Sequence, residues 1–105
     1  MAKVVVWSLA ALQELDELGL YLEENWPELV GDVFRRIFAR ADLLSAFPHL
    51  GSPVPVKHLR DKGYRQLKVC QQRLLYKIAG DRIIIAALAH ERQDLLAAWR
   101  ARKRA

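Results

Sequence analysis

The chain has 105 residues, of which 52% are hydrophobic and 28% are charged. A chain of this length and ordinary composition can bury one modest core, which predicts a single domain over residues 1–105 and excludes a disordered protein. Cys70 is the only cysteine, so an internal disulfide and a cysteine-based zinc site within one chain are excluded. No apolar run reaches the roughly 20 residues of a membrane span, and no signal-peptide core is present, so we expect a cytoplasmic protein.

The net charge of +5 is unevenly distributed along the chain. Residues 1–50 contain 4 Lys or Arg and 8 Asp or Glu, whereas residues 51–105 contain 13 Lys or Arg and 4 Asp or Glu. A basic second half indicates a surface that meets an anionic partner, such as nucleic acid, the ribosome or an acidic protein.

The first half of the chain reads as one strand followed by two helices. Val4–Trp7 is β-branched and aromatic, which predicts a strand, and Ser8 can cap the helix that follows. An apolar stripe at spacings of three and four predicts this first helix: Leu12, Leu15, Leu18 and Leu22. Pro27 suits the first turn of a second helix, which Pro48 ends. We expect the two helices to pack as an antiparallel hairpin.

The second half reads as three strands and a helix. Residues 48–55 contain three prolines and a glycine, which predicts a loop between the two halves. Alternation predicts strands over Tyr64–Cys70 and residues 73–78, and a continuous apolar run predicts an interior strand over Ile83–Ala89. Gly80-Asp81 has the chemistry of a two-residue hairpin turn. With a last helix from Gln93 onward, the order is β-α-α-β-β-β-α: an α+β fold with a helical hairpin packed on a small, mainly antiparallel sheet.

This order, together with specific residues along nearly the whole chain, resembles the RelE/ParE superfamily of type II toxin–antitoxin toxins. The residues that carry the resemblance are Trp7, Ala11, Leu18 to Leu22, Pro27, Leu44, Phe47, Pro48, Gly51, Arg65, Leu67, Arg73, Tyr76, the Ile83 to Leu88 strand and His90-Glu91-Arg92-Gln93-Asp94. The resemblance implies a toxin without a cofactor that a cognate antitoxin holds inactive.

Two activities are known in this superfamily. ParE-like members block DNA gyrase without being hydrolases, and RelE-like members are metal-independent endoribonucleases that cut mRNA on the ribosome. The Pro48-x-x-Gly51 spacing and the His90-x-Arg92-x-Asp94 motif are more similar to the ParE side. A gyrase inhibitor is therefore the first interpretation, a ribosome-dependent ribonuclease is the alternative, and a non-toxic basic nucleic-acid-binding domain is the second alternative.

Metal-free RNA cleavage needs proton transfer and cations on the phosphate, and this chemistry selects the candidate residues. If the protein is a ribonuclease, we expect the catalytic residues to be His90, Arg92 and Arg73, with Glu91 as another possible proton donor. Under either activity, four cations are expected to form an exposed basic face: Arg65, Lys68, Arg73 and Arg92. Tyr76 alternates in phase with its apolar neighbours and is expected in the core.

A metal site is not expected. His49 and His58 flank the proline-rich loop without a carboxylate or cysteine at metal-site spacing.

Overall fold

The computed structural model describes residues 2–104, with side chains through Arg100. The elements in chain order are β1 (Val4–Trp7), α1 (Leu9–Asn25), the 3₁₀ helix η1 (Pro27–Leu29), α2 (Val30–Leu43), β2 (Ser52–Pro53), α3 (Lys57–Asp61), β3 (Tyr64–Val69), β4 (Gln72–Ala79), β5 (Arg82–His90) and α4 (Leu95–Arg104). The predicted α+β fold and its order are confirmed. The structure adds three short elements that the sequence did not indicate, namely η1, β2 and α3.

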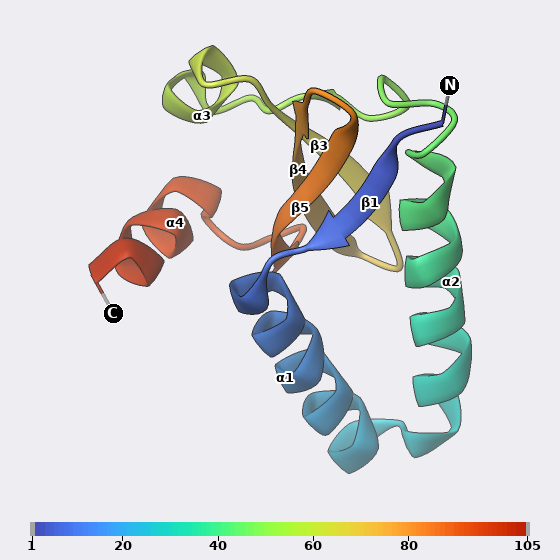
Figure 1. The fold of residues 1–105 in the computed structure, drawn as a ribbon. Helices are drawn as coiled ribbons and strands as arrows, with labels where there is room; N and C mark the ends of the chain where they lie inside the picture. Colours follow the sequence, from blue (N-terminus) through green and yellow to red (C-terminus); the bar gives the residue numbers. More distant parts are fainter. Residues whose placement is uncertain (1, 105) are drawn as a thin grey trace.

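The five strands form one mixed sheet in the order β1-β5-β4-β3-β2 (Figure 1). β1 runs parallel to β5, and the other neighbours are antiparallel. The predicted turn at Gly80-Asp81 joins β4 to β5, with Gly80 at a φ of +61°. β3 and β4 are joined by Cys70-Gln71, whose φ angles of 50° and 63° are left-handed. Two-residue hairpin turns of this kind favour Asn-Gly, so this turn holds two side chains in a conformation that costs free energy.

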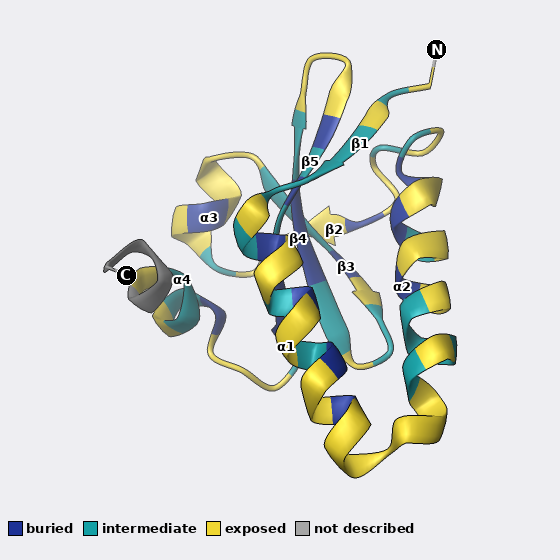
Figure 2. Cartoon of the chain, turned by 60° about the horizontal axis from the view of Figure 1, so that its bottom comes forward, coloured by how far each residue is buried: buried dark blue, intermediate teal, exposed yellow. Residues whose placement is uncertain are grey.

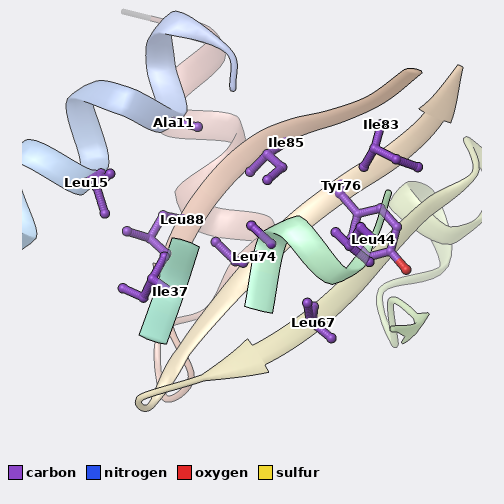
Figure 3. Close-up of a cluster of buried hydrophobic side chains, with 11 residues drawn as sticks. Ala11, Leu15, Ile37, Leu44, Leu67, Leu74, Tyr76, Ile83, Ile85 and Leu88 are labelled. Atoms are coloured by element: carbon purple, nitrogen blue, oxygen red, sulfur yellow. The ribbon is translucent and has the colours of Figure 1, made fainter. Parts of the chain in front are cut away.

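The helices cover the two faces of the sheet unequally. α1 and α2 meet at η1 and splay apart toward the sheet, and their buried residues are turned toward it (Figure 2). The core on this side, which we call the hairpin face, contains Ala11, Leu15, Ile37, Ala41, Leu44, Leu67, Leu74, Tyr76, Ile83, Ile85 and Leu88 (Figure 3). A smaller cluster on the other side, which we call the α4 face, contains Val54, Leu59, Leu75, Ala87, Ala89 and Leu95.

A β-bulge in β5 changes the face to which its residues point. Tyr76 pairs with Ile85 but Leu75 pairs with Ala87, so Ala86 is the extra residue. The alternation therefore shifts by one, and Ile85 and Leu88 both reach the hairpin-face core. The start of α1 holds the bulge in place, since the Ser8 hydroxyl donates to the Ala86 carbonyl at 3.1 Å.

The same helix contacts β5 a second time, two residues after the bulge. The Leu88 N–H donates to Oε1 of Glu14 at 3.2 Å, and Ser8 also caps α1 by accepting from the Ala11 N–H at 3.1 Å. Ser8 and Glu14 thus hold the second half of β5 against α1.

Candidate functional site

His90 lies at the end of β5 on the edge of a groove, which we call the hairpin groove. The groove has a volume of about 620 Å³ and lies between α1, the beginning of α2 and the β3–β4 turn. Its apolar lining includes Tyr21 and Trp26, whose rings meet edge to face at 6.0 Å. Its charged lining is Glu14 and Glu17, and no Lys or Arg lines it among the residues that the structure describes.

The imidazole of His90 is exposed and takes part in the turn that follows β5. Its Nδ1 accepts a hydrogen bond from the Arg92 N–H at 3.1 Å, which places Arg92 next to it in an exposed position. The two residues of the predicted His90-x-Arg92 motif are therefore brought together.

Arg73 lies on the opposite side of the sheet from His90. It pairs with Lys68 on β3 and with Ala89 on β5, and Ala89 belongs to the α4-face cluster. The Arg73 guanidinium donates to the carbonyl of Glu91, so it ties β4 to the turn after β5. Arg73 thus starts on the α4 face, but its guanidinium reaches the carbonyl of the residue between His90 and Arg92.

Arg65 is an anchor for the loop that follows α2. It pairs with Tyr76 on the hairpin face, and its Nη2 donates to the Gly51 carbonyl at 2.6 Å and to the His49 carbonyl at 3.4 Å. The buried Tyr76 hydroxyl donates to the Pro48 carbonyl at 2.8 Å and accepts from the Gly51 N–H at 3.0 Å. The prediction that Tyr76 is a core residue is confirmed.

Glycine is required at position 51 because the chain passes so close to the sheet. A Cβ there would lie 2.3 Å from the carbonyl oxygen of Gln66 and 2.8 Å from the Tyr76 hydroxyl. The Pro48 and Gly51 spacing noted in the sequence thus serves to fasten this loop.

The prediction of a single exposed basic face is wrong in its geometry. Lys68 and Arg73 are cross-strand partners on the α4 face, whereas Arg65 points to the hairpin face with Tyr76. Residues opposite one another in an antiparallel ladder share a face, and odd and even positions alternate. Arg65 and Arg73 are also only half exposed, and each donates to a backbone carbonyl, while Lys68 and Arg92 are exposed as expected.

A second groove, which we call the α2 groove, was not anticipated. It has a volume of about 480 Å³ and is lined by Arg36, Ala39, Arg40, Leu43, Val69 and Cys70. Its charged residues are both cations. For the hairpin groove, the sequence signal was Tyr21, which is not one of the leucines of the α1 stripe and lies five residues before a second exposed aromatic, Trp26.

Neither a metal centre nor a membrane span is found in the described part of the chain. No three His, Cys, Asp or Glu side chains gather there in a way that could hold a metal ion. No described helix combines the length and the apolar character needed to cross a bilayer.

Comparison with protein families gives a match over residues 5–95, to the model described as the ParE toxin of the type II toxin–antitoxin system parDE. The chain belongs to the ParE toxin family. A curated relative, "Putative toxin Y4kP" of Sinorhizobium fredii, is 37% identical to this ParE-family chain over 59 residues. That alignment covers 56% of the chain and 62% of the relative, so the chain spans less than two thirds of the relative's length.

Solved structures share the fold at low sequence identity. A chain of the chromosomal ParDE system of P. aeruginosa superposes with a TM-score of 0.71 at 19% identity, covering 85% of this chain and 96% of that one. A chain of the RelBE2 toxin–antitoxin complex of Mycobacterium tuberculosis gives 0.56 at 18% identity, covering 86% and 99%. A YoeB/ParE toxin of Agrobacterium tumefaciens gives 0.53 at 17% identity, covering 83% and 96%. At these identities the ParE-family chain shares with them the arrangement of hairpin and sheet.

Proposed function

We propose that this ParE-family chain is a growth-inhibitory toxin that blocks DNA gyrase in the cytoplasm and that a cognate antitoxin neutralises. The family description and the toxin–antitoxin complexes among the structural neighbours support the antitoxin as a partner. Inhibition of gyrase is the activity that the resemblance to ParE-like toxins implies.

The surroundings of His90 support inhibition of gyrase over cleavage of RNA. The hairpin groove beside this imidazole is lined by Glu14 and Glu17, and no described Lys or Arg lines it. A phosphodiester entering there would meet like charges, whereas RNA cleavage requires cations aimed at the phosphate where charge develops. The Arg73 guanidinium, which the ribonuclease interpretation requires at the same site, is bound to the carbonyl of Glu91 and does not line this groove.

One observation favours the RelE-like alternative. His90 and Arg92 are both exposed, and the Arg92 backbone N–H donates to Nδ1 of His90, so a residue with an imidazole and one with a guanidinium stand two positions apart at the end of β5. Such a pair can supply proton transfer and one phosphate contact. Ribosome-dependent mRNA cleavage is therefore the second candidate function.

The test compares wild-type toxin with His90→Asn in two assays. Asparagine retains a hydrogen-bond acceptor for the Arg92 N–H but cannot replace the imidazole in proton transfer. We expect both proteins to inhibit supercoiling by purified gyrase and neither to cut mRNA on programmed ribosomes. Cleavage by the wild type that is lost in His90→Asn, without any effect on gyrase, would replace the proposed function by the ribonuclease.

A further inference from the structure

The β3–β4 turn separates two grooves of opposite charge. The hairpin groove has Glu14 and Glu17 as its charged lining, and the α2 groove has Arg36 and Arg40. Cys70, at the turn, lines both grooves. A chain passing over this turn would therefore move from an anionic surface to a cationic one.

Both grooves expose apolar surface of the kind that proteins normally cover. In the hairpin groove, Tyr21 is 53%, Trp26 47% and Leu29 42% exposed, and Leu43 in the α2 groove is 42% exposed. Large apolar side chains that gather in this way mark an interaction site. The turn between the grooves also holds Cys70 and Gln71 at left-handed φ, and strain of this type is often retained where it serves binding.

The α2 groove adjoins a strand edge that β2 leaves open. β2 pairs only with Arg65 and Gln66, so residues 67–69 of β3 have no strand partner on that side within the described part of the chain. Val69 lies both on this edge and in the groove. An extended peptide in the α2 groove can therefore add backbone hydrogen bonds to β3 while its side chains meet Arg40.

We propose that one segment of the antitoxin crosses the β3–β4 turn and fills both grooves, and that this segment is polarised in charge. Its part in the hairpin groove carries apolar side chains with Lys or Arg opposite Glu17, and its part in the α2 groove carries Asp or Glu opposite Arg40. The inference rests on the proposed function, because it takes the antitoxin as the partner. Charge complementarity decides the direction in which the segment runs.

This polarity differs from what net charge alone would predict. The second half of the chain is strongly basic, which favours an acidic partner throughout. The hairpin groove, however, takes its charged residues from α1 in the acidic first half, and carboxylates placed there would repel Glu17. An antitoxin that is acidic overall must still present cations at this one place.

The test measures the dissociation constant between the toxin and the antitoxin encoded by the adjacent gene, for two charge reversals. Glu17→Lys changes an exposed residue of the hairpin groove, and Arg40→Glu changes the α2 groove without breaking the Arg36–Asp32 ion pair. The controls are Glu24→Lys, on α1 outside both grooves, and Arg82→Glu, at the start of β5. We expect each groove variant to weaken binding by about tenfold or more, because the reversed charge would face a like charge across the interface, and the controls to change it little.

The sign of the Glu17→Lys effect decides the inference. Tighter binding by Glu17→Lys would mean that the segment in the hairpin groove is acidic, and would overturn the proposed polarity. Disruption of a toxin homodimer by the same two variants, with no effect on antitoxin binding, would assign the grooves to a second copy instead. Restoration of binding to Glu17→Lys by a Lys→Glu change in the antitoxin would support the proposal directly.

Failure of the inference can be told from failure of the proposed function. If wild-type toxin inhibits gyrase and binds the antitoxin but the charge reversals have no effect, only the inference fails. If wild-type toxin does not inhibit gyrase, the proposed function fails, whatever the binding measurements show. Thermal unfolding of each variant confirms that the substituted proteins are folded.

Discussion

We expect the hydroxyl of Tyr76 to contribute more to the free energy of unfolding than the hydroxyl of a partly exposed tyrosine does. It is fully buried, donates to the Pro48 carbonyl at 2.8 Å and accepts from the Gly51 N–H at 3.0 Å. Tyr76→Phe keeps the ring and its packing but leaves both backbone groups without this partner. The Gly51 N–H is buried there, and the Pro48 carbonyl is partly buried.

The magnitude follows from those two backbone groups. A buried donor or acceptor left unsatisfied costs about 1–3 kcal/mol, and no cavity term arises because only one oxygen is removed. Arg65 continues to hold the Gly51 carbonyl at 2.6 Å, which keeps the loop near its place and puts the expected loss at about 2 kcal/mol. For a domain of this size, 2 kcal/mol lowers the melting temperature by roughly 8–16 °C.

Urea unfolding followed by tryptophan fluorescence measures this loss, with Tyr64→Phe as the matched control. Tyr64 is half buried and packs its ring on Trp99 at 5.2 Å, so removal of its hydroxyl should change stability by less than about 0.5 kcal/mol. Equal midpoints for the two variants would refute the role assigned to the Tyr76 hydroxyl. Because that hydroxyl is buried, the toxicity of Tyr76→Phe per folded molecule should be unchanged. A variant that loses toxicity but keeps its stability would point to a catalytic role for the hydroxyl instead.

Three further substitutions test the turn, the cross-strand tie and the start of α1. Gln71→Gly should raise the free energy of unfolding by about 1 kcal/mol, because it relieves a left-handed φ of 63°, whereas the control Gln72→Gly in β4 should lower it. A loss of stability in both variants would contradict strain at the turn. Arg73→Ala should lower the free energy of unfolding by about 1.5–3 kcal/mol, because a charged hydrogen bond is lost, and the control Lys68→Ala should lower it by less than about 0.5 kcal/mol. Equal unfolding midpoints for the two variants would show that this hydrogen bond contributes nothing to stability. Ser8→Ala should cost about 1–2 kcal/mol in the same urea assay, because one hydroxyl both caps α1 and holds the bulge, and an unchanged midpoint would remove it from that role.

Local patterns were sufficient for most of the elements of this fold. The β-branched run of Val4–Trp7 and the alternation around Tyr76 predicted strands and identified which side chains enter the core. The additional elements were missed because they are too short to show a period. α3 has five residues and β2 has two, and the residues after Pro27 form one turn of 3₁₀ helix before α2 starts.

The site was less predictable because its geometry depends on pairing between strands. Alternation within β3 and within β4 places each arginine relative to its own strand, but only the register shows that Arg65 lies opposite Tyr76 and not beside Arg73. The bulge at Ala86 adds a second shift that no local pattern indicates. The hairpin groove lies between the helices and the β3–β4 turn, and the α2 groove lies between α2 and the end of β3, so both depend on the tertiary packing.

The parallel pairing of β1 with β5 also makes completion of the sheet a late event in synthesis. Val4–Trp7 is made before all the other elements described here, yet its partner residues begin at Arg82. At 5–20 residues per second, the ribosome needs roughly 2–9 s to proceed from the end of α2 to the end of β5. Throughout that interval the leucine stripe of α1 has no sheet to cover it, and neither groove exists, because both take a wall from the β3–β4 turn. We therefore expect the nascent chain to be aggregation-prone until β5 has been made, and expect the antitoxin to bind it only after that point.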